Sequence, residues 1–381
     1  MTRIGVLFSL TSPVRGGVEE VVLALLQRLD PSEFRLALAA PQALLDSFAS
    51  DLHGVALDTE AVQADSWTRR HDVARLSAFI GRVQPHIVNP HLFRSTLVAA
   101  PVAKWHGARV VETYHGREGW RGSLMRGGFL PDRMIGKLVD RTIAVSEAAR
   151  AFLISSKGYA ADKVVVVPNG RDLSTFRPGI ARDAVRKELG LDRVVPIVGV
   201  VGRLEAQKGH AYLFEAWPSV VAEFPDARLL VVGDGSLRSR LEARARELEV
   251  ADSVMFAGFR ADVPRVLDAL DVLVLPSLYE GMPLTAIEAS AMGRPVVATA
   301  VDGTPEVIRE ARTGRLVPPA DPAGLSRAIR GVLRDPLGAQ RMGRAGRDFV
   351  LDRFDLDRQV ANTARVYRDV AGVRSQARRA A

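Results

Sequence analysis

Two glutamates separated by a short, distinctive segment are the residues in this chain best suited to chemistry. They stand at the two ends of the segment Glu280-Gly281-Met282-Pro283-Leu284-Thr285-Ala286-Ile287-Glu288. The later part of this segment predicts a helix from about Thr285. Glu280 then stands at the helix amino terminus, where its carboxylate can accept hydrogen bonds from sugar hydroxyls. Glu288 falls one turn inside, among alanine and isoleucine, where an unpaired carboxylate is costly and ribose hydroxyls would be a suitable partner. Paired glutamates are common, but the glycine and proline make this segment specific.

Two cations lie earlier in the same half of the chain. Gly202-Arg203-Leu204 follows an apolar run, and Lys208-Gly209 comes five residues later. An arginine can grip a diphosphate through its planar fork, whereas a lysine acts as a point charge. Because these residues follow the carboxyl end of an expected strand, the sequence favours an anion site over a solvated basic loop.

Glycines and one aromatic residue end other expected strands. Gly16 and Gly17 precede a helix expected near Val18, where backbone N–H groups can approach an anion, although on their own two glycines indicate only a turn. Gly233 permits close approach of a ligand, although an ordinary turn explains it equally well. Gly258-Phe259-Arg260 offers a planar group that can stack on a base, although Phe259 could equally belong to the core. The dinucleotide fingerprint G-x-G-x-x-G is missing from the first of these turns.

Alternating apolar runs and amphipathic stretches must position these residues. Runs rich in valine and isoleucine are typical of buried parallel strands, and we expect them at 4–8, 34–39, 87–89, 110–113, 142–145, 164–167, 197–201, 228–232, 254–256, 272–275, 295–298 and 314–317. Helical periodicity predicts helices at 18–29, 72–82, 95–106, 147–155, 210–223, 236–248, 263–269, 285–292, 322–333 and 357–370. This order predicts doubly wound α/β sheets.

The α/β pattern restarts once, after the turn signal Arg177-Pro178-Gly179. We therefore expect one Rossmann-like domain at 1–175 and a second at 176–360. Residues 361–381 form a C-terminal helix and basic tail that can pack back on the first domain. In such a protein, ligands bind at the carboxyl ends of the strands, in a cleft that the two sheets face.

Composition narrows the class of protein. The 381 residues suit two domains. The formal charge of +8 makes phosphate-bearing ligands, anionic lipid and nucleic acid the candidate partners, and solubility alone is the alternative explanation. The chain has no cysteine, which excludes thiol catalysis, disulfides and Cys-ligated metals. No stretch approaches 18 uninterrupted apolar residues, and the first ten residues predict a strand instead of a signal peptide, so we expect a cytoplasmic location.

The ordered set of these motifs resembles glycosyltransferase family 4, a group of retaining nucleotide-sugar transferases with the GT-B fold. The similarity extends over nearly the whole chain. It is carried by Gly16-Gly17, Asn89-Pro90-His91, Thr113-Tyr114-His115-Gly116, Val145-Ser146, Pro168-Asn169-Gly170, Gly202-Arg203-Leu204, Lys208-Gly209, the segment from Pro276 to Glu288, Ala298-Thr299 and Asp302-Gly303-Thr304-Pro305-Glu306.

The resemblance implies a donor site and a role for each residue in it. Arg203 and Lys208 would neutralise the donor diphosphate, and the Gly17 backbone would approach the phosphates or the sugar. Glu280 would hold the sugar hydroxyls, with Gly281, Met282, Pro283 and Leu284 nearby, and Glu288 would bind ribose. Phe259 and Arg260 would border the base, with Gly233 and Gly258 in the same site. His115 would face the reacting end of the sugar; the alternative is a strand-end histidine bonded to backbone.

The implied mechanism needs no metal and no cofactor. Negative charge grows on the leaving diphosphate, and placed cations and helix amino termini stabilise it. The segment Asp355-Leu356-Asp357 begins a polar helix, and we interpret it as capping, not as a metal site. Families of this kind are thought to retain configuration through front-face attack, with the leaving phosphate taking the acceptor's proton.

The acceptor side is less clear in the sequence. His91 and the segment from Trp120 through Arg121 and Arg126 to Arg141 are the candidates, and this segment interleaves apolar and basic residues. It could lie on an anionic membrane at the inner face of the cytoplasmic membrane and bring a glycan or lipid-linked acceptor to the donor. An ordinary amphipathic helix packed on its own domain is the equal alternative.

Other functions remain open at this point. A nucleotide-sugar epimerase on the same fold would use carboxylates in the cleft wall of the first domain, and the only ones that we place near it are Glu112, Glu118 and Asp132. A transferase for a soluble small acceptor is a further alternative. Nucleic-acid binding is disfavoured because clusters of glycine, basic and aromatic residues are missing. UDP-sugars and GDP-mannose are the leading donors. The resemblance implies a role in the synthesis of a cell-surface polysaccharide, lipopolysaccharide or glycolipid, and the excess of arginine over lysine suits a GC-rich bacterial genome.

Overall fold

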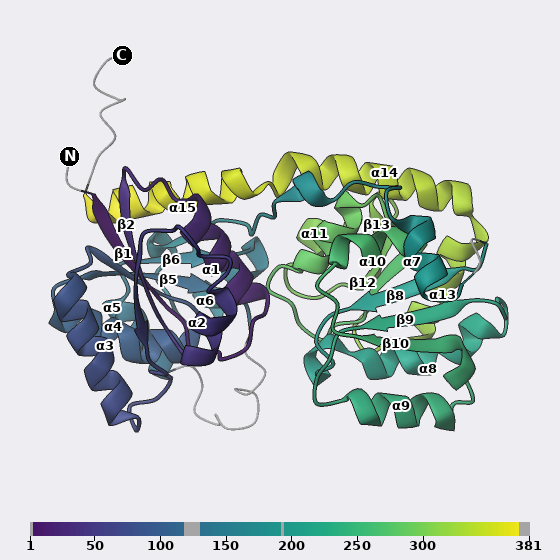
Figure 1. The fold of residues 1–381 in the computed structure, drawn as a ribbon, viewed down its shortest axis with the longest axis horizontal. Coiled ribbons are helices and arrows are strands. Elements are labelled where there is room, and N and C mark those ends of the chain that lie inside the picture. The colour runs from purple at the N-terminus through teal and green to yellow at the C-terminus, as the bar shows by residue number, and fades with distance from the viewer. Residues whose placement is uncertain (1–2, 118–129, 192–193, 373–381) are drawn as a thin grey trace, which may run out of the picture. The chain divides into compact units, whose positions relative to one another are not determined.

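A computed structural model describes residues 3–117, 130–191 and 194–372 of the chain. These residues form two compact units (Figure 1). Unit 1 comprises Met1–Gly170 and Leu356–Ala381, and unit 2 comprises Arg171–Asp355. The sequence placed the two boundaries at 175/176 and 360/361, whereas the structure divides the chain five residues earlier in each case. The whole C-terminal helix therefore belongs to unit 1.

Unit 1 is built on a seven-stranded parallel sheet in the order β3-β2-β1-β4-β5-β6-β7. Its strands are β1 (Ile4–Ser9), β2 (Phe34–Ala40), β3 (Leu57–Ala61), β4 (Ile87–Pro90), β5 (Arg109–Tyr114), β6 (Arg141–Ala144) and β7 (Val164–Val166). The central strands are buried almost throughout because helices cover both faces of the sheet. The helices are α1 (Gly17–Arg28), α2 (Gln42–Phe48), α3 (Arg70–Val83), α4 (Phe93–Trp105), α5 (Leu130–Leu138), α6 (Glu147–Ser155) and α15 (Leu356–Ala371).

Helix α15 returns from the end of unit 2 to complete unit 1. Figure 1 shows it in yellow along the unit that holds β1 and β2. Its Tyr367 is fully buried, with the ring edge-on to Phe8 and Phe34 at centroid distances of 6.4 and 6.1 Å. Gln359 Oε1 accepts from the backbone N–H of Gly170 at 2.7 Å. These contacts bury the apolar face of α15 against the first sheet.

Unit 2 repeats the architecture with six parallel strands in the order β10-β9-β8-β11-β12-β13. The strands are β8 (Ile197–Val201), β9 (Arg228–Val232), β10 (Val254–Gly258), β11 (Val272–Leu275), β12 (Val296–Thr299) and β13 (Gly314–Val317). The helices are α7 (Arg182–Glu188), α8 (His210–Val221), α9 (Arg238–Glu247), α10 (Val263–Ala269), α11 (Leu284–Ala291), α12 (Thr304–Val307), α13 (Pro322–Arg334) and α14 (Pro336–Arg353). The predicted fold class, two doubly wound parallel-sheet domains of Rossmann type, is confirmed.

Local sequence explains where several helices begin. Ser146 accepts from the Ala149 N–H at the start of α6, and Asp321 accepts from the Gly324 N–H at the start of α13. Asp335 does the same for α14 through Gly338, with a proline at the first helical position. Each cap satisfies an amide group that would otherwise lack a partner.

Each sheet has one point where the strand order reverses direction. In unit 1 it lies between β1 and β4, and in unit 2 between β8 and β11. Open α/β sheets bind ligands at the carboxyl ends of the strands at this point. The loops after β8 and β11 are those that carry Arg203 and Lys208 on one side and Glu280 on the other.

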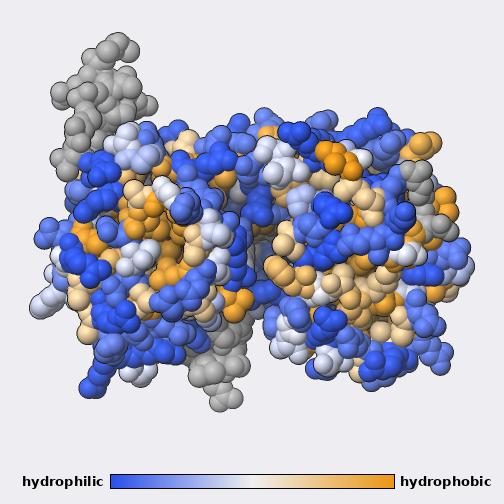
Figure 2. Space-filling view, viewed as in Figure 1, coloured by the Kyte–Doolittle hydropathy of each residue, from blue (hydrophilic) through white to orange (hydrophobic). Residues whose placement is uncertain are grey.

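The surface of both units mixes polar and apolar residues. On the face drawn in Figure 2, hydrophilic side chains interleave with hydrophobic ones over each unit. Among the described residues, every helix is too short or too polar to cross a lipid bilayer.

Candidate active site

A lysine and a glutamate meet where the strand order of unit 2 reverses. Lys208 Nζ donates to Glu280 Oε1 at 2.6 Å, and Ser277 Oγ donates to the same oxygen at 2.7 Å. Glu280 is 6% exposed, while the Lys208 side chain keeps 21% of its surface. An ammonium group has three N–H donors, so the two that remain on Lys208 can reach an anion from the solvent side. The sequence assigned these two residues to neighbouring ligand groups, and the structure brings them into direct contact.

Two glycines let the loops of this site approach each other closely. Gly209 has φ +64°, and a Cβ atom there would lie 2.0 Å from the carbonyl oxygen of Pro276. Gly233 has φ +128°, and its Cβ would lie 2.0 Å from the carbonyl oxygen of Gly202. Any side chain at either position would push the loops apart, because both neighbours are backbone atoms. The loops after β8, β9 and β11 are thus packed backbone to backbone.

Arg203 is exposed at the same edge, and none of the ion pairs found among the described residues includes it. The neighbouring carboxylate, Glu205, accepts from Ser236 at both its N–H and its hydroxyl group, at 3.0 and 2.8 Å. The Arg203 guanidinium is therefore exposed on the loop after β8 that also carries Lys208, and its charge helps to lower the pKa of Glu205. An exposed cation of this kind is free to close on an incoming phosphate.

Glu280 also joins the start of α11 to the loop after β12. Its backbone N–H donates to Asp302 Oδ2 at 3.1 Å. Gly281, Met282 and Pro283 then lead into α11, which begins at Leu284. The amino-terminal amides of α11 are placed directly after the Glu280 carboxylate, as the sequence predicted.

Glu288 has a partner that the sequence did not reveal. Arg171 Nε lies 2.7 Å from Glu288 Oε1, and the Glu288 side chain is 8% exposed. We expected this buried carboxylate to depend on ribose hydroxyls, whereas an arginine from the first residue of unit 2 already contacts it. The contact between Arg171 and Glu288 could not be predicted from the sequence, because the two residues are far apart in the chain.

Phe259 and Arg260 follow β10 but have different surroundings. Phe259 is 79% exposed, so it is not a core residue. The Arg260 guanidinium donates to Asp262 and Glu188, and these contacts raise its pKa. Gly258 has φ +66°, and its carbonyl oxygen accepts from the Gly233 N–H at 2.8 Å, which joins the end of β10 to the loop after β9.

A buried histidine beside Lys208 was missed by the sequence analysis. His210 opens α8 and is 1% exposed, and neither of its ring nitrogens has a hydrogen-bond partner among the described residues. Burial and the nearby Lys208 lower its pKa to about 4. It is therefore neutral at physiological pH and adds no charge to the site.

Two stacked histidines lie at the equivalent edge of unit 1. His91 Nδ1 is 2.8 Å from His115 Nε2, and the ring centroids are 5.0 Å apart. His91 is fully buried, and burial together with His115 lowers its pKa well below the usual value. Burial lowers the pKa of His115 to about 3. We expected His91 on the acceptor surface; instead it supports His115 from inside.

Gly16 and Gly17 stand at the start of α1, after β1. Gly16 is the N-cap residue in an extended conformation, and Glu19 and Glu20 occupy the first turn. Arg15 pairs with Glu20 and, at 2.7 Å, with Asp51. These acidic residues compete with any phosphate for the helix amino terminus. The predicted role of the two glycines stays a prediction.

Some predicted residues lie outside the part of the chain that the structure describes. These are Trp120, Arg121 and Arg126 of the acceptor segment, together with Glu118, Arg374, Arg378 and Arg379. Within the described ranges, no group of three or more histidine, aspartate or glutamate side chains could hold a metal ion.

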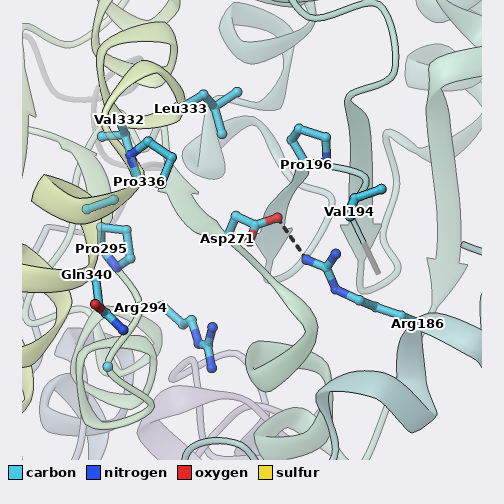
Figure 3. A pocket seen from close by; sticks show the side chains of 12 residues that line it. Arg186, Val194, Pro196, Asp271, Arg294, Pro295, Val332, Leu333, Pro336 and Gln340 are labelled. Atoms are coloured by element: carbon cyan, nitrogen blue, oxygen red, sulfur yellow. Dashed lines mark hydrogen bonds and ion pairs between the residues drawn. The ribbon is translucent and has the colours of Figure 1, made fainter. Parts of the chain in front are cut away.

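A cavity of 280 Å³ lies at the amino ends of the unit 2 strands, at the opposite end of the sheet from the candidate site (Figure 3). It is lined by Pro196, Val332 and Leu333 and by the Arg186–Asp271 ion pair, whose atoms lie 2.8 Å apart. Arg186 is 1% exposed and also donates to the carbonyls of Ala269 and Val195. Arg186 and Asp271 thus neutralise each other's charge within the protein. The cavity is also remote from the loops that carry Lys208 and Glu280, and we do not include it in the candidate site.

Together, two Rossmann-type units and a cation–carboxylate site at one switch point define a GT-B glycosyltransferase architecture. Comparison with known proteins places the chain within it. Residues 15–175 match the model of glycosyltransferase family 4, and residues 195–335 match that of glycosyl transferases group 1. The chain belongs to this family.

Two relatives share sequence with about two thirds of the chain. D-inositol 3-phosphate glycosyltransferase of Segniliparus rotundus is 36% identical, over 68% of this chain and 61% of its own length. The GDP-mannose-dependent monoacylated α-(1-6)-phosphatidylinositol monomannoside mannosyltransferase of Corynebacterium glutamicum is 34% identical, over 66% and 68%. The Anabaena HepE structure with UDP and glucose superimposes with a TM-score of 0.82, at 20% identity over 96% of this chain and 99% of HepE, which shows the shared fold.

Proposed function

We propose that this protein is a retaining glycosyltransferase that moves a sugar from a nucleotide-sugar donor to a hydroxyl group of a glycan or lipid-linked acceptor. UDP-sugars and GDP-mannose are the proposed donors, and the proposed reaction requires neither a metal ion nor a cofactor. The observation that carries the proposal is the Lys208–Glu280 pair at the switch point of unit 2, with exposed Arg203 on the same loop as Lys208.

The proposed mechanism follows from the charges of this site. Cleavage of the bond between the anomeric carbon and phosphate leaves negative charge on the diphosphate, which Lys208 and Arg203 stabilise as it grows. Glu280 accepts from sugar hydroxyls and holds Lys208 in place. Glu288, with Arg171, binds the ribose. The leaving phosphate takes the acceptor's proton, so that no carboxylate has to act as a covalent nucleophile.

The burial of two carboxylates in unit 1 disfavours the epimerase alternative. Glu112 is 1% exposed on β5, and Asp132 is fully buried on α5 against Lys157. A carboxylate that moves a proton must reach the substrate. Neither of these groups is accessible at the surface of unit 1.

A nucleotide-sugar panel in a thermal-shift assay tests the donor proposal. A donor at 100 times its dissociation constant adds about 2.7 kcal/mol of stability, which corresponds to roughly 5–10 °C for a unit of this size. We expect such a shift with a UDP-sugar or GDP-mannose, equal in EDTA and in Mg²⁺. Glu288→Ala and Arg203→Ala are expected to abolish the shift relative to their own unliganded melting temperatures.

The matched control is Arg240→Ala, which removes an exposed arginine elsewhere in unit 2 and should keep the full shift. Absence of a shift with every donor in the wild-type protein would contradict the donor proposal. A thermal shift that appears only with Mg²⁺ would contradict the proposal that no metal is required, but not the donor proposal.

We further propose that unit 1 binds an anionic membrane surface as a peripheral protein at the inner face of the cytoplasmic membrane. Helix α5 supports this, because Leu130 and Met134 are 61% and 62% exposed next to the exposed cations Arg133 and Lys137. The inositol-phosphate lipid in the name of the Corynebacterium relative's acceptor supports a lipid-linked acceptor here.

Liposome co-sedimentation tests the membrane proposal. We expect binding to vesicles with anionic lipid at low salt, weakened by salt and by the double substitution Met134→Ser with Lys137→Glu. Leu351→Ser, at an exposed leucine on α14, is the control and should bind like the wild type. Equal sedimentation with and without anionic vesicles at low salt would refute membrane binding.

A further inference from the structure

We propose that Asn89 and Tyr367 are positioning residues that lock His115 in one tautomer. In this tautomer Nε2 carries the proton and points to His91, and Nδ1 keeps a lone pair that can accept a hydrogen bond from a substrate hydroxyl. The inference deepens the proposed function, since it rests on His115 meeting the donor sugar. It concerns unit 1 alone, and each of its steps is a hydrogen bond within that unit.

Partners on both of its sides set the orientation of the buried Asn89 amide, and those on β5 come first. Its Nδ2 donates to the carbonyl oxygen of Val111 and, at 3.0 Å, to Thr113 Oγ1. A carbonyl oxygen can only accept, so the nitrogen of the amide must be on the β5 side. The Asn89 side chain is completely buried, and water cannot replace these partners.

The amide oxygen of Asn89 then dictates the donors on its other side. Tyr367 O–H donates to Oδ1 at 2.6 Å, and His91 Nε2 lies 3.2 Å from the same atom. Because Oδ1 can only accept, His91 must carry its proton on Nε2. The hydroxyl of Tyr367, from the C-terminal helix, opposes rotation of the amide, since a flipped amide would leave this buried O–H without an acceptor among the described residues.

The proton on His91 Nε2 determines the tautomer of His115. Complete burial keeps His91 neutral, so its Nδ1 has a lone pair and must accept from His115 Nε2 at 2.8 Å. Burial likewise keeps His115 neutral, and with Nε2 protonated its Nδ1 has no proton. The opposite arrangement would set two lone pairs against each other between His91 and Asn89 inside the protein.

The consequence is a histidine that accepts but does not donate toward the substrate. His115 is half-buried, whereas Asn89, His91 and Tyr367 are inaccessible. In the described part of the chain, Nδ1 of His115 makes no hydrogen bond. A sugar hydroxyl that donates to this atom is thereby selected over a group that can only accept.

The tautomer can be read directly by nitrogen-15 NMR of full-length protein labelled at histidine. Protonated and unprotonated ring nitrogens have well-separated shifts, and loss of a signal in His115→Gln assigns it. We expect wild-type His115 with unprotonated Nδ1 and protonated Nε2. In Tyr367→Phe and Asn89→Leu, we expect mixed tautomers at both histidines. Tyr212→Phe, a tyrosine on α8, is the matched control and should keep the wild-type spectrum.

The second measurement is transferase activity, with the donor that gives the largest shift in the thermal-shift panel. If the competent tautomer falls from nearly all to about half of the molecules, kcat in Tyr367→Phe falls about two-fold or more. A protonated Nδ1 in the wild type, or His115 signals unchanged in both folded variants, would overturn the inference. If Asn89→Leu does not fold, Tyr367→Phe alone decides. A wild-type spectrum as expected, without binding of any donor, would refute the proposed function and leave the tautomer lock standing.

Discussion

Replacing Lys208 by methionine is expected to lower kcat/KM by about 10²- to 10³-fold, which corresponds to the loss of one group that stabilises charge in a transition state. The ammonium group is the cation anchored at the switch point, where Glu280 holds it at 2.6 Å. The effect should fall mainly on kcat, because the diphosphate gains its negative charge as the sugar leaves. Release of nucleoside diphosphate from the donor measures it.

A double variant separates the two causes of such a loss. Lys208→Met also leaves the buried Glu280 without its cation, and this alone could distort the loop. Lys208→Met with Glu280→Gln removes that charge but restores no cation at the phosphate. We expect the double variant to be as slow as the single one. Recovery in the double variant, or a single-variant loss below about ten-fold, would contradict the assigned role. Lys187→Met, at an exposed lysine on α7, is the control.

Replacing Lys157 by methionine is expected to destabilise unit 1 by about 3–5 kcal/mol, the cost of breaking a buried ion pair from one side. Lys157 is 3% exposed, and its Nζ lies 2.9 Å from Oδ1 of the fully buried Asp132. It also stands 4.5 Å from the ring centroid of Tyr114. Urea unfolding, combined with hydrogen exchange of the β5 amides, measures the change within unit 1.

The destabilisation by Lys157→Met should grow with pH. Burial raises the pKa of Glu112, and the positive charge of Lys157 opposes that rise. Without Lys157 the folded-state pKa of Glu112 is higher still. A carboxyl group with a raised folded pKa contributes stability below its unfolded pKa, and that contribution is lost as pH rises through the folded value. The variant should therefore lose less stability at pH 5 than at pH 8.

Lys137→Met, at an exposed lysine of α5, is the matched control and should change stability by less than about 0.5 kcal/mol. A Lys157→Met variant that loses less than about 1 kcal/mol at pH 8 would show that the buried pair is not needed. An equal loss at both pH values would contradict the coupling to Glu112.

The sequence was most informative where a strand is buried on both faces. The ranges 197–201, 228–232, 272–275 and 314–317 coincide with β8, β9, β11 and β13, because a short, continuous apolar run bounded by turn residues is typical of a buried parallel strand. Strand β3 (Leu57–Ala61) was missed. It is at the sheet edge with two of its residues exposed, so that its pattern contains no apolar run.

Helix α14 (Pro336–Arg353) was also missed, in this case because of its glycines. It contains Gly338, Gly343 and Gly346, which lower helix propensity, so that its 18 helical residues were not predicted. In the structure a Cβ at Gly343 would lie 2.0 Å from the carbonyl oxygen of Gly293, just after α11. Close packing between helices explains this glycine, and no local pattern in the sequence contains that information.

In the candidate site, too, some features were predictable from the sequence and others were not. The positions of Arg203, Lys208 and Glu280 after strands were predictable, since the strands themselves were. Their pairing was not, because the contact between Lys208 and Glu280 requires β8 to lie next to β11, and the order of strands in a sheet is a property of the whole fold. The contact between Arg171 and Glu288 depends on the same long-range order.

The return of α15 to unit 1 affects how the protein is made. A ribosome completes Met1–Gly170 first, yet the sides of Phe8 and Phe34 that contact Tyr367 stay uncovered until Tyr367 has been synthesised, after all of unit 2. The unit that is synthesised first is therefore finished last. During that interval its apolar surface is open to chaperones and to other nascent chains, and a message truncated before residue 356 would yield a complete unit 2 joined to an unfinished unit 1.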